Sequence, residues 1–253
     1  MIIETFLNDI MKLPDHNDLP CEDGVPKETF LEHPQAMLLS ETIRPVLREL
    51  HPDGQFIIGN DSGIYWRMAD PPLKGAVAPD WFYIPHVPPK IDGKGRRSYV
   101  MWQEMERPAL VIEFSSRDGS AERDRTPNTG KFWIYERKIE ATYYAIYEVE
   151  KAFVEVYRLE LGRYRKMEPN QRGHYPIPEI GIDLGIWRGL YTNVEFAWLR
   201  AWDVDGELLQ TWEEKDQIPR RQSEIEWLRA EQEKQRADKL AVQLKAMGID
   251  PDA

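Results

Sequence analysis

Cysteine is almost absent from this sequence, and long apolar runs are missing altogether. Cys21 is the single cysteine of 253 residues, which excludes an intrachain disulfide framework and a cysteine-rich zinc site. No segment approaches the roughly 20 consecutive apolar residues that a transmembrane helix needs. The opening segment, MIIETFLNDIMKLPDH, lacks the basic start and apolar run of a secretory signal peptide. Together these absences favour a soluble protein of the reducing cytoplasm.

Apolar and aromatic residues are plentiful enough for a large core. Hydrophobic residues make up 42% of the chain, which contains 9 Trp, 11 Tyr and 8 Phe, and this composition excludes a disordered protein. The formal net charge of −11 weighs against general affinity for polyanions, because phosphate contacts come from Lys and Arg. Residues 90–138 nevertheless contain more Lys and Arg than Asp and Glu. That excess indicates either a local phosphate-binding surface or an ordinary solvated one.

The N-terminal half of the chain predicts one helix followed by strands. Residues 36–50 have apolar side chains at helical spacing. The segments 55–60 and 63–68 predict a strand pair joined by a tight Asp-Ser-Gly turn. Two further strands are predicted at 74–85, interrupted by a proline, and at 99–104.

The C-terminal half supplies the rest of a sheet. Residues 106–116 form the most strand-like run and predict a buried central strand. Residues 131–139 predict a helix, and 141–160 predict two strands with a turn at Glu150-Lys151. Gly- and Pro-rich residues at 162–189 favour short edge strands and turns. The order of strands, helix and further strands predicts an α/β (α+β) fold with a mixed sheet flanked by helices.

The composition changes near residue 212, which predicts a domain of residues 1–212 and a charged C-terminal helix of residues 213–253. Several apolar side chains of this tail are spaced for one helical face: Ile225, Leu228, Leu240, Leu244 and Met247. The middle of that face holds Gln232 and Gln235. Both a short coiled coil and a lone solvated helix fit this pattern.

Three residues far apart in the chain are candidates for chemistry: Asp80, Glu113 and Lys131. Asp80 follows Pro79 at a strand edge, where a carboxylate can project from the sheet. Glu113 interrupts the apolar run LVIEF, and a buried carboxylate is costly unless it is paired, hydrogen-bonded or bound to a metal. Lys131 opens the predicted helix and can reach back to such a site. Two carboxylates and a lysine suit metal-assisted phosphodiester hydrolysis, with the carboxylates holding Mg²⁺ or Mn²⁺.

Each of these residues also has a purely structural interpretation. Glu113 can be a strand-end residue paired with an arginine such as Arg107 or Arg125. Asp80 can cap a turn, and Lys131 can begin an exposed helix. Spacing alone does not choose between the two interpretations.

A family resemblance favours the metal site. The stretch PALVIEFSSRDGSAERDRTPNTGKFWIYERKIEATYYAIYE, with APDWFYIP upstream, resembles the Uma2 family, also called DUF820, which is abundant in cyanobacteria. That family is similar to restriction endonucleases. The resemblance spans roughly residues 30–210 and implies the PD-(D/E)xK nuclease core, here with an extended C-terminal helix.

The resemblance also implies roles for individual residues. The Pro-Asp motif maps to Asp80, and the apolar-Glu-apolar-Ser motif maps to Glu113 and Ser115. Ser115 stands where the classical core has its lysine, and the family places that lysine on the next helix, which makes Lys131 the candidate. Glu41, on the first predicted helix, is the candidate for an additional acidic metal ligand.

Three hypotheses follow from these observations. The leading one is a Mg²⁺- or Mn²⁺-dependent endonuclease that acts on nucleic acid, with DNA as the expected substrate, and works as a homodimer. The second is a catalytically silent nucleic-acid-binding or regulatory domain on the same fold. The third is an oligomerising interaction protein that acts through its helical tail.

Overall fold

The computed structural model describes residues 14–15, 18–19, 30–115 and 118–246. The chain divides into two compact units between Leu209 and Gln210, and each unit is described by itself. The helical elements of the first unit are α2 (Glu32–Leu50), the 3-10 helix η1 (Pro72–Gly75), α3 (Met101–Glu104), α4 (Lys131–Ile134) and the π-helix η2 (Tyr135–Ile139).

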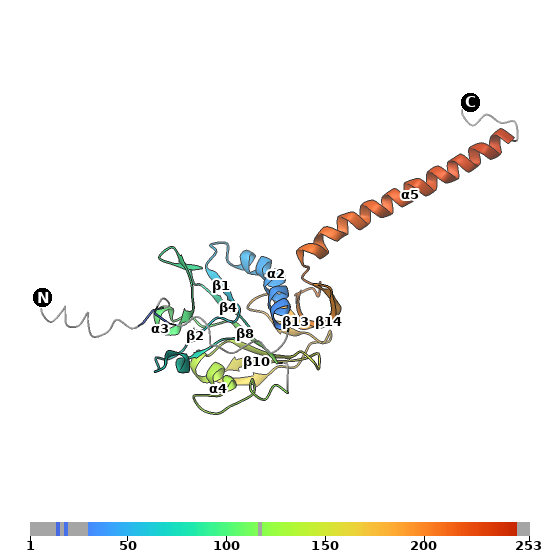
Figure 1. Cartoon of the computed structure of the whole chain (residues 1–253). Coiled ribbons are helices and arrows are strands. Elements are labelled where there is room, and N and C mark those ends of the chain that lie inside the picture. The colour runs from blue at the N-terminus through green and yellow to red at the C-terminus, as the bar shows by residue number, and fades with distance from the viewer. Residues whose placement is uncertain (1–13, 16–17, 20–29, 116–117, 247–253) are drawn as a thin grey trace, which may run out of the picture. The chain divides into compact units, whose positions relative to one another are not determined.

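A six-stranded mixed sheet forms the centre of the first unit (Figure 1). In spatial order its strands are β1 (Phe56–Gly59), β4 (Trp81–Pro85), β8 (Leu110–Ser115), β9 (Tyr143–Glu148), β10 (Phe153–Glu160) and β11 (Arg163–Lys166). The β8–β9 pair is parallel and the other pairs are antiparallel. Every residue of β8 is buried, which confirms the predicted central strand and explains its nearly continuous apolar sequence.

The two faces of this sheet pack against different partners. One face carries Trp81, Leu110 and Ile112, which pack with Leu39 and Ile43 of α2. The opposite face carries alternate residues of the same strands, including Phe82 and Val111, and packs with Phe132 and Tyr135 of α4 and η2. Figure 1 shows α2 and α4 on opposite sides of the sheet. This mixed sheet flanked by helices confirms the predicted α+β fold.

Smaller sheets complete the first unit. A three-stranded sheet joins β12 (Tyr175–Ile177), β13 (Ile182–Tyr191) and β14 (Val194–Asp203). A second contains β3 (Ala76–Val77), β2 (Ile64–Tyr65) and β7 (Tyr99–Val100), and a two-stranded ladder joins β5 (Lys90–Ile91) to β6 (Lys94–Gly95). Gln35 of α2 exchanges two hydrogen bonds with the backbone of Leu199 in β14, at 2.8 and 2.9 Å, which ties the helix to that sheet.

Three of the predictions are wrong. Residues 162–189 were expected to form short edge strands and turns, but β13 has ten residues and is the middle strand of its sheet. The segments 55–60 and 63–68 do not form a hairpin, because β1 pairs with β4 while β2 pairs with β3 and β7. The backbone N–H of Asp61 donates to the carbonyl of Pro79 at 3.0 Å, so the turn is held by a distant segment. Residues 99–104 contain only the two-residue strand β7 before the chain turns into α3.

Helix α5 (Trp212–Ala246) makes up most of the second unit. A reciprocal capping box begins it: Thr211 Oγ1 accepts from the backbone N–H of Glu214 at 3.2 Å, and the Glu214 carboxylate accepts from that of Thr211 at 2.8 Å. Ile225, Leu228 and Leu240 are exposed. No described helix is long and apolar enough to cross a membrane.

Candidate active site

Neighbouring strands bring the two predicted carboxyl groups together. Asp80 immediately precedes β4, and Glu113 lies in β8. In the antiparallel register Trp81 stands opposite Ile112, so continuing the ladder by one residue sets Asp80 opposite Glu113. The Asp80 carboxylate accepts a hydrogen bond of 2.5 Å from the backbone N–H of Phe114, which fixes Asp80 against β8.

Both oxygens of the Glu113 carboxylate have partners. Glu113 is 0% exposed. Lys131 Nζ lies 3.0 Å from its Oε2, and the Tyr135 hydroxyl donates to its Oε1 at 2.6 Å. A carboxylate buried in an apolar sheet is tolerated only when its lost hydration is replaced, and an ammonium and a phenol supply that replacement.

The loop before α4 sets the position of Lys131. Gly130 lies directly before the helix, where an added Cβ would stand 2.3 Å from the backbone carbonyl oxygen of Asp124. Asp124 also accepts from the backbone N–H of Thr126 at 2.8 Å, which closes the loop on itself. Lys131 and Tyr135 are four residues apart and therefore project from one side of the helix towards the same carboxylate.

Burial and neighbouring charges shift the pKa values of Asp80 and Lys131. Burial first, and then the neighbouring negative charge of Glu113, raise the pKa of the Asp80 carboxyl to about 9, although the hydrogen bond from Phe114 opposes this. Burial lowers the pKa of Lys131, but the carboxylates of Glu113, Asp80 and Glu122 outweigh it and hold the pKa above its ordinary value. These shifts favour the protonated form of Asp80 and the ammonium form of Lys131.

The structural interpretation of Glu113 as the partner of a nearby arginine is wrong. Arg107 pairs with Glu140 at 2.6 Å, and Arg125 lies 3.9 Å from Glu136. The partner of Glu113 is Lys131.

Glu41 lies on α2, one residue from Ser40, whose hydroxyl accepts a 3.0 Å hydrogen bond from the indole of Trp81. This contact brings the helix next to the residue that follows Asp80. The Glu41 carboxylate itself lies 3.5 Å from the hydroxyl of Tyr191. Its role as a metal ligand stays a prediction.

Two residues of the cluster, Tyr135 and Glu122, were not identified from the sequence. Tyr135 is fully buried and bonds directly to Glu113, and the Glu122 carboxylate lies 3.8 Å from Lys131 Nζ. The spacing of Lys131 and Tyr135 by four residues was a usable signal for the first. Glu122 lies in an irregular loop, where sequence spacing does not predict direction.

The donor set fits a Mg²⁺ or Mn²⁺ ion that is also held by its substrate. Mg²⁺ is usually bound through one or two carboxylates together with substrate phosphates and water, and Asp80 and Glu113 supply two carboxyl groups close enough to interact. Within the described ranges no group of three or more His, Cys, Asp or Glu side chains is arranged to hold a metal ion. Asp80 and Glu113 are thus the two carboxyl groups that would hold the ion.

The comparison with protein-family models agrees with the resemblance seen in the sequence. No curated protein matches the chain. A crystal structure from Anabaena variabilis ATCC 29413, described as "a putative nuclease belonging to DUF820", is similar with 16% identity and a TM-score of 0.40 over 69% of this chain and 89% of that one. The sequence model of the Uma2 family, described as "Putative restriction endonuclease", matches residues 25–195. The chain therefore belongs to the Uma2 family.

Proposed function

We propose that this protein is a divalent-metal-dependent endonuclease that hydrolyses phosphodiester bonds of nucleic acid, with DNA as its substrate. One observation carries the proposal: Asp80, Glu113 and Lys131, far apart in the chain, lie together in one cluster. The description of the Uma2 family supports the same reaction class.

Each residue has a distinct role in this reaction. Asp80 and Glu113 would hold the cation, and a bound cation would supply positive charge that stabilises the negative charge developing on the phosphate. Lys131 keeps its proton, because the surrounding carboxylates hold its pKa high. It therefore serves as a hydrogen-bond donor that orients the attacking water and offsets negative charge, rather than as a general base.

Tyr135 is a positioning residue in this scheme. Its hydroxyl fixes one Glu113 oxygen, so the carboxylate presents a constant geometry to the ion. Supporting groups of this kind typically change metal affinity or activity by about 10- to 100-fold.

The test is nicking of a supercoiled plasmid in Mg²⁺ or Mn²⁺. We expect cleavage by the natural protein and none by Asp80→Ala or Glu113→Gln. Glu155→Gln is the matched control, because Glu155 is also a buried glutamate paired with cations, Arg123 and Lys166, on another part of the sheet. Equal cutting by Glu113→Gln and Glu155→Gln would refute the assignment.

A catalytically silent binding domain is the second candidate function. Two observations favour it: Ser115 stands where the classical motif has lysine, and no three-carboxylate metal group is found among the described residues. Binding of nucleic acid that weakens with salt, without nicking in any divalent metal, would establish this alternative.

We also propose that the protein acts as a homodimer. Helix α5 exposes Ile225 and Leu228, three residues apart, on a long charged helix, which supports pairing through the tail. Light scattering should give twice the chain mass for the full chain and a smaller assembly for a chain ending at residue 212. An unchanged assembly after truncation would place any dimer contact in the first unit.

A further inference from the structure

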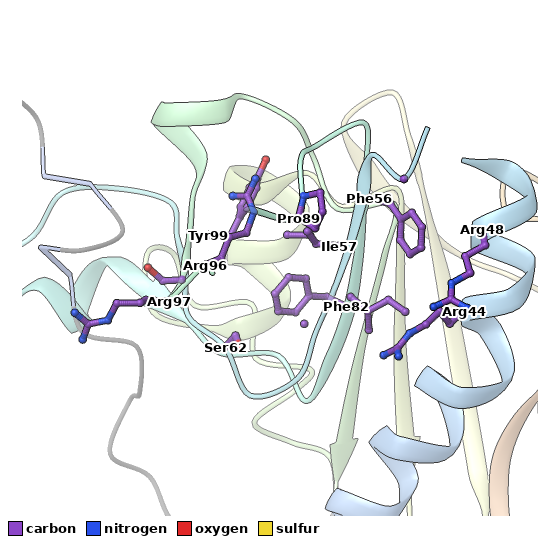
Figure 2. Close-up of a pocket in the computed structure, with 14 residues that line it drawn as sticks. Arg44, Arg48, Phe56, Ile57, Ser62, Phe82, Pro89, Arg96, Arg97 and Tyr99 are labelled. Carbon is purple, nitrogen blue, oxygen red and sulfur yellow. The ribbon is translucent and has the colours of Figure 1, made fainter. Parts of the chain in front are cut away.

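A cavity of about 540 Å³ lies at the outer strand of the central sheet (Figure 2). Its walls carry four arginines: Arg44 and Arg48 of α2, and Arg96 and Arg97 of the segment before β7. No Asp or Glu is among the fourteen lining residues. In a chain of net charge −11, such a concentration of positive charge selects an anion.

The arginines differ in whether their charge is paired within the protein. Arg96 is paired with Glu104 and also donates to the carbonyl of Pro88, so it is part of the wall. Arg44 and Arg48 are exposed and form neither ion pairs nor hydrogen bonds with the described part of the chain. They are one helical turn apart, which sets both guanidinium groups on one side of α2. Two adjacent unpaired guanidinium groups suit a phosphate.

The floor of the cavity is apolar. Ile57 of β1 and Phe82 of β4 line it together with Pro89, and Figure 2 shows Phe82 between the two pairs of arginines. Gly59 keeps this floor flat, because a Cβ there would stand 2.1 Å from the Phe82 ring. A flat apolar surface beside positive charge suits an aromatic ring that carries a phosphate, which describes a nucleotide.

The cavity lies at the outer edge of the sheet and is lined from both of its faces. Phe82 of β4 and Asp80, just before β4, are two residues apart, so both side chains leave the face that holds Glu113. Arg44 and Arg48 belong to α2, which packs on the opposite face. Phe82 also belongs to the packed cluster that contains Tyr135, the partner of Glu113. Phe82 thus joins the cavity to the candidate active site through the core, while Arg44 and Arg48 line the cavity from the α2 side of the sheet.

We propose that this cavity binds one unpaired nucleotide of the nucleic-acid strand, away from the bond that is cut. Its phosphate contacts Arg44 and Arg48, and its base covers Ile57, beneath which the ring of Phe82 is buried. The inference rests on the proposed function, and it adds that the substrate is bound through a single-stranded segment. A duplex presents phosphates and base edges but hides its base faces, so it would fill the charged part of the cavity and not the apolar part.

The test measures binding without cleavage. Fluorescence anisotropy of a short fluorescein-labelled single-stranded DNA is recorded in EDTA, with the same sequence as a duplex for comparison. The double variant Arg44→Gln/Arg48→Gln should bind the single strand at least about tenfold more weakly at low salt. The slope of log affinity against log salt should fall by about 0.7, because the neutralisation of one phosphate is lost.

Two controls separate this site from general electrostatics. The double variant Arg165→Gln/Arg188→Gln removes the same charge from exposed positions outside the cavity and should leave affinity within about twofold, since exposed charges away from the ligand are screened. Ile57→Ser should weaken binding by several-fold without changing the salt slope, because it removes apolar contact and no charge.

The outcomes distinguish this inference from the proposed function. Binding that depends on Arg44 and Arg48 in a protein that never cuts would keep the inference and refute the nuclease. Cutting that is unaffected by Arg44→Gln/Arg48→Gln would refute the inference and keep the nuclease. Equal weakening by both arginine pairs, no binding of the single strand, tighter binding of the duplex, or binding of free mononucleotide but not of the strand would each overturn the inference.

Discussion

Two charged regions border the central sheet, one on a face and one at its outer edge, and they differ in whether their charges are paired. In the cluster of Asp80, Glu113 and Lys131, the Lys131 ammonium lies 3.0 Å from a Glu113 carboxylate oxygen, so opposite charges are paired. In the arginine-lined cavity, Arg44 and Arg48 have no charged partner among the described residues. The first arrangement requires charged groups to lose their hydration, and its stability depends on every member of the cluster. The second leaves charge in solvent, available to a ligand.

The difference predicts where stability and function are coupled. Removing one member of a buried ion pair leaves its partner uncompensated and destabilises the fold. Removing an exposed, unpaired arginine changes little besides what binds there. Substitutions in the carboxylate cluster should thus affect folding and activity together, whereas substitutions in the cavity should affect binding alone.

The largest effect is expected for Lys131→Met. Plasmid nicking should fall by at least about 100-fold, because the charge that faces the phosphate is lost. Lys138→Met, an exposed lysine of the neighbouring π-helix, is the control and should nick at the normal rate. Similar rates for the two variants would show that Lys131 only supports the structure of the site.

Tyr135→Phe should lower both stability and activity. The variant leaves a Glu113 oxygen without its donor in a fully buried position, which costs about 1–3 kcal/mol of unfolding free energy in urea denaturation. Nicking should fall by about tenfold. Tyr164→Phe is the matched control, because its buried hydroxyl donates instead to backbone carbonyls, those of Ala141 at 2.9 Å and Tyr135 at 3.2 Å, and not to Glu113. That variant should lose stability and retain activity, and a matched loss of activity would remove the positioning role of Tyr135.

Asp80→Asn should change how stability depends on pH in EDTA. The folded pKa of Asp80 is raised from 3.8 to about 9, so the folded state binds more protons than the unfolded state between these values. Stability of the natural protein should therefore fall as pH rises through this window, by at most about 1.4 kcal/mol per unit, less solvent screening. Thermal unfolding of Asp80→Asn should show a flatter pH dependence, and parallel curves for the two proteins would contradict the burial of Asp80 beside Glu113.

The sequence revealed those parts of this site that depend on local pattern. Glu113 stood out because a carboxylate interrupted an apolar run, and β8 is indeed central and buried. The helix at Lys131 was also visible, since the pattern of Lys, Tyr and Glu in residues 131–139 is local. Both features arise from periodicity within a few residues.

The missed features depend on contacts between distant segments. The predicted hairpin at 55–68 failed because the partner of β1 is β4, and neither segment's own pattern specifies that pairing. The cavity combines Arg48 of the first helix with Arg96, and only the excess of basic residues at 90–138 hinted at one wall. Sequence spacing identified the charges, but tertiary pairing decided which of them meet.

The smallest effect is expected for the stability of Arg44→Gln/Arg48→Gln. This measurement tests whether the two regions differ in their contribution to folding. Neither guanidinium forms an ion pair with a described residue, so the unfolding free energy should change by less than about 0.5 kcal/mol. Urea denaturation of this variant, with Lys131→Met and Arg165→Gln/Arg188→Gln measured for comparison, gives the change in unfolding free energy. A large loss of stability would mean that the two arginines support the fold, in which case weaker DNA binding by this variant would no longer identify a ligand site.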